Sequence, residues 1–465
     1  MTNLIRILGA ALVGSAVWVG SASAALIAVG HENLNAGSGS LFIFGAPGST
    51  GTATSGFGFN QAFTIPLTGV IEINVPTTNF ISSAENDTVV NKAITINSAS
   101  PISAHFLNRA PFTTDMTYLH DVSSLGTSYR VLGFTGNFGE GGQISVTATQ
   151  NNTVVTITPT VALNGNPAGV PFTRTLQAGE SIKYSSGFPD PSGTTITSNN
   201  PVAVFSGAEC TQVPNGNTAC DHIVSQLPST NNFDTRWIVP ETANQGAAGN
   251  VVSILAHTDN TTVTINGAVV ATLAAGQVHT VNNAHDMEIV TSAPALVGQY
   301  LRGQTQTGTG TGDPAFTFLP GVNQLLKDYV FSTPVGADAF VQNVLSVAIM
   351  QSDLASLMLN GLLVNAALFT PLGATGWSTA NLDIPVGAGR ITANNPFFAS
   401  ISGYSSFDSY LTIIGATFSP GASPPPPPPP PSSTIPEPAA LGVYGLGMAW
   451  IGVLMLMRRR ESKLA

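Results

Sequence analysis

Charged side chains are scarce in this sequence of 465 residues, at 8% of the total. Acidic residues outnumber basic ones by 24 to 14, which gives a formal net charge of −10. So few cations leave little material for a basic patch, which argues against binding to nucleic acid or anionic lipid. The helix-favouring residues Glu and Lys are few, whereas Gly numbers 48. This composition is typical of an extracellular all-β protein.

Cysteine is scarcer still: the chain contains two cysteines, Cys210 and Cys220. The segment between them contains Pro214 and Gly216, which allow it to turn back on itself. In an oxidising compartment we expect a disulfide between the two, which stabilises by roughly 2–3 kcal/mol through chain entropy. The alternative is a metal-binding or nucleophilic pair, for which His222 is the one histidine nearby.

Recognisable catalytic and cofactor motifs are also missing. The seven histidines form neither His-x-His nor His-Glu-x-x-His, no Gly-x-Ser-x-Gly occurs, and the Gly-Thr run at 308–312 lacks the Lys of a phosphate loop. We therefore predict a protein that is not an enzyme, with no catalytic, cofactor-binding or metal-binding residues. Two alternatives stay open: a hydrolase whose carboxylates meet only on folding, and Ca²⁺ at module junctions. The junction carboxylates are Asp115, Asp121, Asp221 and Asp313.

The N-terminus has the pattern of a secretory signal peptide. Arg6 precedes an apolar run over residues 7–19, and Ala22-Ser23-Ala24 is a small-residue cleavage pattern in front of Ala25. We expect signal peptidase to cut between Ala24 and Ala25. Residues 1–24 would then be removed, and the rest of the chain exported.

The C-terminus carries a second targeting pattern. Eight prolines at 424–431 precede an uncharged stretch over 439–457, and a cluster of three arginines follows it. As a helix, that stretch would span roughly 28 Å, close to the ~30 Å hydrocarbon core, with the arginines on the cytoplasmic side. We predict a transmembrane helix in the inner membrane; an ordinary C-terminal anchor is the alternative to the sorting signal described next. The triplet Pro436, Glu437 and Pro438 lies just before the predicted helix, and the arginine cluster after it consists of Arg458, Arg459 and Arg460.

The order of these parts resembles the PEP-CTERM sorting signal of Gram-negative bacteria. The resemblance implies an exosortase-type processing enzyme as a partner. Residues 421–435 would be a Pro-rich linker and residues 436–465 the sorting signal. The protein would be anchored in the membrane transiently and then reside at the cell surface or outside the cell.

The region between the two signals repeats. A hydrophobe, Thr or Asn, Ser or Ala, one or two short residues and a Pro recur at Pro101, Pro201, Pro294 and Pro396. By subtraction these prolines are 100, 93 and 102 residues apart. We expect each to lie at a strand entrance, where its missing N–H costs no ladder hydrogen bond.

Further markers run in step with the prolines. Tyr129, Trp237 and Tyr329 each lie nine residues after a His or Pro. Thr-Leu-x-Ala-Gly occurs at 175–179 and 272–276, and it predicts turns with positive φ at the glycines. Short runs of alternating β-branched residues separate these turns and predict strands.

A period near one hundred residues matches one β-sandwich and is much longer than a propeller blade. We therefore predict an all-β fold of tandem β-sandwich-like modules, with a C-terminal transmembrane helix, in which neighbouring modules can share sheets. The predicted modules are residues 25–112, 113–221, 222–311 and 312–420.

Several segments between residues 90 and 330 form a set: the run 90–96 with Pro101, the run Pro201–Gly207, and above all Cys210 and the Cys220-Asp221-His222 segment followed by Gln226-Leu227-Pro228. Through these segments, residues 90–330 resemble the N-terminal domain of the IgGFc-binding proteins. This resemblance implies a secreted or surface protein. No residue set marks an antibody-binding site, so the resemblance implies no such activity for this chain.

Taken together, the sequence predicts a non-enzymatic, exported surface or extracellular-matrix protein that acts in adhesion or matrix association. Its ligand would be a matrix polysaccharide or a cell-surface molecule. A receptor for exopolysaccharide is the alternative. It is weakened because two of the four tryptophans, Trp18 and Trp450, belong to the targeting segments.

Overall fold

The computed structural model describes residues 24–35, 37–336 and 339–418. This part of the chain is built from strands joined by turns and short 3₁₀ segments, with a single four-residue helix, α1 (Gln304–Thr307), among the described residues. The predicted all-β class is confirmed. Within the same residues no helix has the length and apolar character needed to cross a membrane. The predicted span at 439–457 lies outside the described residues.

The first unit is a pair of four-stranded sheets. Apolar side chains such as Leu26, Ile43 and Phe106 fill the space around them. One sheet has the strand order β1 (Ala24–Ala28), β8 (Ile94–Ser98), β4 (Thr50–Thr54), β5 (Asn60–Thr64). The other has the strand order β10 (Thr113–Leu119), β9 (Ile102–Ala110), β3 (Ser38–Gly45), β6 (Val70–Val75). In addition, the short strand β2 (Gly30–His31) pairs with β7 (Phe80–Ile81).

Each later unit is organised around one long strand that pairs with outer strands in its first part and with inner strands in its second. In unit 2 the long strand is β16 (Thr195–Thr211), with β11 (Gly126–Arg130), β12 (Phe138–Ala148), β13 (Thr153–Thr158), β14 (Phe172–Leu176), β15 (Ser181–Gly187) and β17 (Asp221–Gln226). In unit 3 it is β23 (Met287–Leu301), with β18 (Asp234–Val239), β19 (Asn250–Ala256), β20 (Thr261–Ile265), β21 (Ala268–Leu273), β22 (Val278–Ala284) and β24 (Ala315–Leu319).

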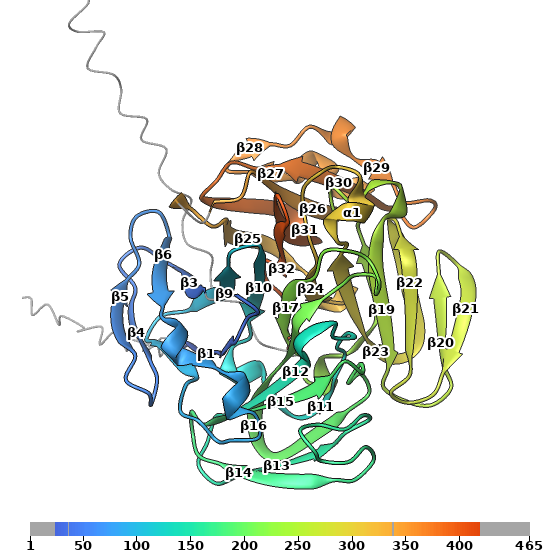
Figure 1. Ribbon diagram of the computed structural model, residues 1–465. Helices are drawn as coiled ribbons and strands as arrows, with labels where there is room; N and C mark the ends of the chain where they lie inside the picture. Colours follow the sequence, from blue (N-terminus) through green and yellow to red (C-terminus); the bar gives the residue numbers. More distant parts are fainter. Residues whose placement is uncertain (1–23, 36, 337–338, 419–465) are drawn as a thin grey trace, which may run out of the picture.

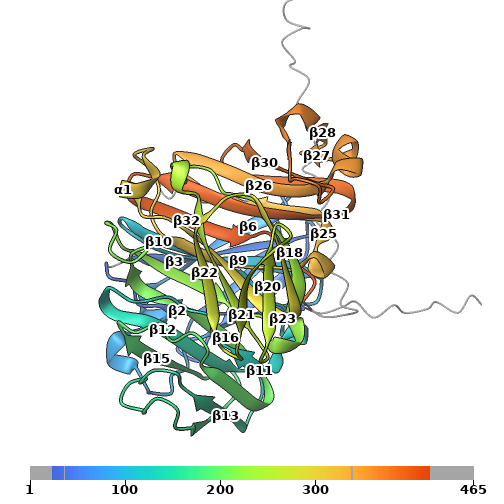
Figure 2. The ribbon, with the colours of Figure 1, turned by 90° about the vertical axis from the view of Figure 1, so that its right-hand side faces the viewer.

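Unit 4 repeats the scheme around β31 (Ala388–Ser405). Figure 2 shows its outer hairpin, β27 with β28, at the edge of the molecule, beyond β26 and β31. The other strands are β25 (Leu326–Ser332), β26 (Gln342–Met350), β27 (Met358–Leu359), β28 (Leu362–Leu363), β29 (Thr370–Pro371), β30 (Trp377–Asp383) and β32 (Asp408–Ile413).

The repeated prolines mark the point where a long strand changes partners. Pro201 lies inside β16, between Ser198, which pairs with β13, and Val202, which pairs with β12. Pro294 and Pro396 occupy the same place in β23 and β31. The expected position at a strand entrance is therefore right for Pro101, which precedes β9, and wrong for the other three. Pro is tolerated there because no ladder bond needs its N–H while the strand passes from one set of neighbours to the next.

In units 2 and 4 the aromatic repeat marker forms a hydrogen bond to the long strand, next to the marker proline. The hydroxyl of buried Tyr129 donates to the carbonyl of Val202 at 2.6 Å, and that of Tyr329 donates to Phe397 at 2.5 Å. Both acceptors follow a marker proline, so each Tyr holds a long strand at its change of partners. In unit 3 the Trp237 indole donates instead to Leu319 at 3.3 Å.

The predicted glycine turns are present. Gly179 and Gly276 both have φ of +81°, a backbone conformation that favours glycine. Asn266 and Gly267 form a two-residue turn with φ of +49° and +82° between β20 and β21, which is the expected chemistry for such a hairpin.

The four units close into a ring. The last strand of each unit, β10, β17, β24 or β32, lies at the centre (Figure 1); β10 contacts β17 and β32, and β24 contacts the same two strands. Residues 113 and 221, where two module boundaries were predicted, begin β10 and β17. The boundaries themselves stay predictions.

The hydrophobic cores lie between neighbouring units as well as within them. Phe205 of unit 2 joins the core of unit 1, and Leu255 of unit 3 joins that of unit 2. Phe398 of unit 4 packs into the core of unit 3, and Phe42 of unit 1 packs into that of unit 4. Each unit therefore buries apolar surface against both neighbours, so the four units are held together more firmly than independent domains joined by linkers.

Asp115 holds the centre of the ring. Its carboxyl group is fully buried on β10 and accepts the backbone N–H groups of Met116 at 2.8 Å, Val224 at 3.0 Å, Phe316 at 2.9 Å and Leu411 at 3.3 Å. The last three belong to β17, β24 and β32. One side chain thus connects all four central strands, and it supplies acceptors for N–H groups that would otherwise be buried without partners.

Candidate functional site

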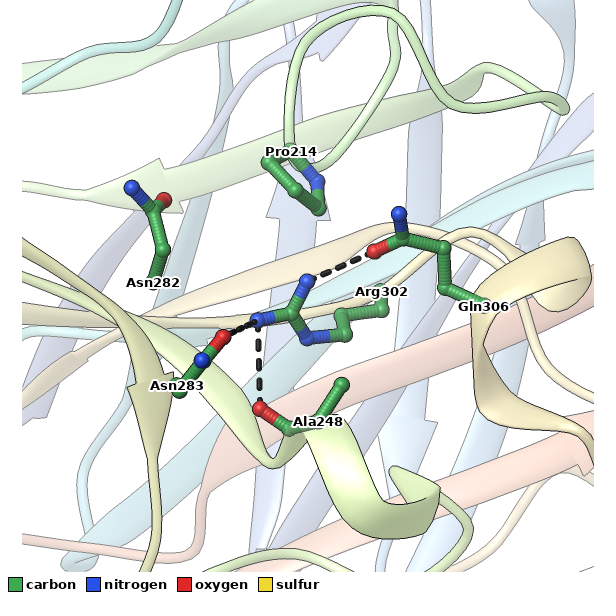
Figure 3. A pocket seen from close by; sticks show the side chains of 6 residues that line it. All are labelled: Pro214, Ala248, Asn282, Asn283, Arg302 and Gln306. Carbon is green, nitrogen blue, oxygen red and sulfur yellow. Dashed lines mark hydrogen bonds between the residues drawn. The ribbon is translucent and has the colours of Figure 1, made fainter.

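A pocket of about 580 Å³ opens where units 2 and 3 meet. Figure 3 shows the side chains around it, with Arg302 in the middle, Gln306 on one side and Asn283 on the other. The lining comes from the loop after β16, the 3₁₀ segment before β19, strand β22, the residue that follows β23 and helix α1. Its residues are Pro214, Ala248, Asn282, Asn283, Arg302 and Gln306.

The loop between Cys210 and Cys220 forms one wall of this pocket through Pro214, and a disulfide joins its two ends. The two Cα atoms are 5.2 Å apart, and the bond closes the loop that carries Pro214. The loop also attaches to unit 3, because the N–H of Gly303 donates to the carbonyl of Val213 at 2.9 Å and the amide of Gln306 donates to Asn217. The expected disulfide is thus present, and it positions a segment of unit 2 against the pocket in unit 3.

Arg302 forms the floor of the pocket and is 2% exposed. Its Nε donates to the carbonyl of Gly249, and Nη1 donates to Oε1 of Gln306 at 2.7 Å. Nη2 donates to the carbonyl of Ala248 and to Oδ1 of Asn283, both at 3.2 Å. The guanidinium group is therefore fixed in one orientation by three segments of unit 3.

All four acceptors are uncharged. No carboxylate contacts Arg302 in the part of the chain that the structure describes. Burial lowers the pKa of Arg302, but a guanidinium group stays protonated in proteins. The pocket therefore carries a buried positive charge without a protein counter-charge, an arrangement suited to an anionic group.

A second polar cluster lies where the sheet of unit 2 packs against unit 1. Lys183 on β15 is fully buried, and its Nζ has no hydrogen-bond partner among the described residues. Burial lowers the pKa of Lys183, against the opposing effect of the charges on Glu209, Glu32, Glu140 and Glu85. Burial also raises the pKa of Glu209. A lysine and a carboxyl group shifted toward their neutral forms are what acid–base chemistry uses, so the hydrolase alternative would be tested here.

The junction carboxylates have separate roles. Asp115 is the hub described above, and Asp121 accepts the N–H of Ser123 at 2.8 Å at the start of a 3₁₀ turn. Asp221 and Asp313 are fully buried and interact electrostatically with each other. Among the residues that the structure describes, no three or more His, Cys, Asp or Glu side chains are arranged to hold a metal ion.

Other predicted site residues lie at or beyond the ends of the described structure. Ala24 is the first residue of β1, where it pairs with Ser98, and Ala25 pairs with Asn97. The sorting motif and the arginine cluster fall in residues 419–465, outside the described part.

Sequence reasoning missed Arg302 and Lys183. Their partners are far away in the chain, as with the 54 positions between Ala248 and Arg302. No short spacing could have indicated either cluster.

Comparisons with known proteins give one family. A family model described as "IgGFc binding protein" matches residues 115–403, which is more than half of the chain. A human "IgGFc-binding protein" is 35% identical over 158 residues, covering 33% of this chain and 3% of that protein. The chain thus spans a small fraction of its curated relative.

Among solved structures, an anti-sigma factor domain-containing protein from Clostridium clariflavum covers 69% of this chain and 85% of its own, with 9% identity and a TM-score of 0.12. That similarity is too low to support an argument about the fold. The family match rests on the sequence between the hub strand β10 and the last long strand β31, which includes the disulfide loop and the Arg302 pocket. By that match, the chain belongs to the IgGFc-binding protein family.

Proposed function

We propose that this protein is exported and works by contact, at the cell surface or in the extracellular matrix, rather than by catalysis. The observation that carries the proposal is the pocket at the unit 2–3 junction, which is already formed, open to solvent and braced by a disulfide. Preformed pockets on rigid supports are typical of binding proteins. Membership of a family named for binding supports the same conclusion.

Export is proposed on two grounds. The disulfide fits an oxidising compartment, because thiols in the cytosol are kept reduced. The sequence before Ala25 has the pattern of a signal peptide. We further propose that an exosortase-type enzyme processes the tail at Pro436, Glu437 and Pro438, after transient anchoring in the inner membrane.

Antibody binding is not part of the proposal. The human relative's name describes binding to IgG Fc, but the aligned segment is 3% of that protein. The proposed ligand is instead a polysaccharide of the matrix or a molecule of the cell surface. A polysaccharide receptor is favoured as the more specific form because the pocket lining is rich in amide side chains.

The test of contact function is a deletion of residues 25–420 that keeps both targeting signals. We expect cell aggregation and matrix retention to fall, while hydrolytic activities in the medium stay unchanged. The control is a Lys183→Met variant, which removes the amine of the second polar cluster. If the deletion left adhesion intact and abolished turnover of a polymer, and Lys183→Met did the same, the protein would be a hydrolase.

Sorting has its own test. Mass spectrometry of protein released from cells should find no peptide after residue 438, and replacing Pro436, Glu437 and Pro438 with Ala should keep the tail in the membrane. Released wild-type protein that still carried Arg458–Arg460 would contradict the sorting proposal and leave the contact function open.

A further inference from the structure

One N–H group of the Arg302 guanidinium has no acceptor in the described part of the protein, and Arg302 lines the pocket. A guanidinium group has five N–H donors and no acceptor. Four of the five are used: one on Nε, one on Nη1 and two on Nη2. The remaining donor is on Nη1, in a residue that lines the pocket.

Two asparagines add donors at the same opening. A guanidinium group can only donate, so the oxygen of Asn283 faces Arg302 and its amide nitrogen is turned elsewhere. Asn282 is exposed, on the same edge of the pocket in Figure 3. Gln306 closes the opposite side, and its amide nitrogen is held by Asn217 of the disulfide loop. The pocket therefore offers one charged donor flanked by neutral amides.

We propose that this pocket binds a carboxylate-bearing sugar residue of an acidic polysaccharide. The carboxylate would accept the free Nη1–H of Arg302 and supply the missing counter-charge, and sugar hydroxyls would bond to the amides of Asn282 and Asn283. The inference rests on the proposed function in one respect, that the protein meets a polymer outside the cell.

Other anions fit the pocket less well. A cavity of about 580 Å³ is in the size range of organic ligands and is larger than an isolated carboxylate fills. A nucleic acid would bring many phosphates to a chain with a net charge of −10. A peptide with a C-terminal carboxylate would bring the same charge, so a peptide is included as the competing ligand in the experiment below.

The experiment measures binding of the purified full-length protein to polygalacturonate, to the same polymer after full methyl esterification, and to a peptide with a free or amidated C-terminus. We expect binding to polygalacturonate that weakens at least tenfold on esterification and that falls as salt is added. Equal binding to the esterified polymer, or binding to the peptide alone, would overturn the proposal.

Matched variants locate the site. Asn282→Asp places a negative charge at the pocket opening, and Asn60→Asp places the same charge on an exposed strand of unit 1 as the control. We expect a tenfold or greater loss of polygalacturonate binding in the first and no change in the second, with equal melting temperatures. Arg302→Lys tests the guanidinium group and should also lose binding. If Asn282→Asp bound as well as Asn60→Asp, the pocket would not be the site.

These outcomes separate the inference from the contact function. Loss of aggregation on deletion of residues 25–420, combined with no binding to polygalacturonate, would leave the contact function standing and remove the acidic-sugar site.

Discussion

The ring axis and the unit 2–3 pocket each contain a buried ionisable side chain, and the hydrogen bonds of the two differ. Asp115 accepts N–H groups from all four central strands, and these contacts use both of its oxygens. Arg302 donates to four neutral oxygens, keeps one further N–H donor, and lines an open cavity. A saturated polar group surrounded by strands holds a fold together, whereas an unsaturated one beside a cavity is available to a ligand.

Asp313, on the axis side, belongs to neither type. It is fully buried, and a hydrogen bond with the backbone of Gln304 lowers its pKa only in part against the effect of burial. Burial raises its pKa to about 8, and the charge of Asp408 adds to the shift. Protonation is the simplest way for such a group to avoid a buried charge.

The largest expected effect comes from breaking the hub. Asp115→Ala should lower the free energy of unfolding by about 3–5 kcal/mol, because buried N–H groups on four strands lose their acceptor. Chemical denaturation would measure this. Asp383→Ala, at an exposed carboxylate of β30, is the control and should change stability by less than about 0.5 kcal/mol. Equal losses in the two variants would show that the hub is dispensable.

Removing the disulfide tests the pocket's wall. Cys210→Ser with Cys220→Ser should lower the free energy of unfolding by roughly 2–3 kcal/mol, since the unfolded chain regains loop entropy. Because the loop carries Pro214, binding to polygalacturonate should weaken as well. Denaturation with and without a reductant provides the comparison in the wild type. Identical unfolding midpoints in both conditions would contradict this prediction.

Two buried tyrosines provide a reference for the free energy that hydrogen bonds of a neutral buried group contribute. Tyr129→Phe and Tyr329→Phe each remove a hydroxyl that donates to one backbone carbonyl and accepts one N–H, from Gly126 and from Leu326. We expect each to lower the free energy of unfolding by about 1–2 kcal/mol. Thermal unfolding of the two variants side by side measures this. A loss in only one of them would mean that the two units do not use the tyrosine in the same way.

The last prediction, and the one that depends on pH, concerns Asp313. Its folded-state pKa is raised, so its contribution to stability is fully present below the unfolded pKa near 3.8 and is lost as the pH rises through about 8. Asp313→Asn does not titrate. The variant should therefore gain stability relative to wild type as the pH rises from 4 to 9, because only the wild-type carboxyl group is opposed to ionising in the folded state.

Melting temperatures across that range would measure the gain. The groups facing Asp313 include Asp221, whose pKa burial also raises, and Asp408. An advantage that was the same at pH 4 and pH 9 would show that ionisation of Asp313 is not its cause.

Local features of the fold could be predicted from the sequence. The strand class, the positive-φ turns at Gly179 and Gly276, and the pairing of Cys210 with Cys220 depend on short segments whose chemistry is visible in the chain itself. The repeat markers were found for the same reason. The structural role of these markers could not be predicted, because the contact between Tyr129 and Val202 joins positions 73 residues apart.

The ring and the pocket depend on contacts between units. A period near one hundred residues is compatible with separate tandem domains or with a closed ring. The ring forms because neighbouring units share hydrophobic cores, such as the one in which Phe42 packs with unit 4. Arg302 has an ordinary sequence context, and it becomes a candidate site because the disulfide loop of unit 2 closes over it.

The sequence by itself determined the all-β class, the repeat, the disulfide partners and the turns, since each follows from residue types within a few positions of one another. Only the tertiary structure decided that four units share their cores, that Asp115 joins four strands, and that Arg302 is buried without a counter-charge. Burial and counter-charge depend on which distant segments meet, and that is set by the packing of the whole chain.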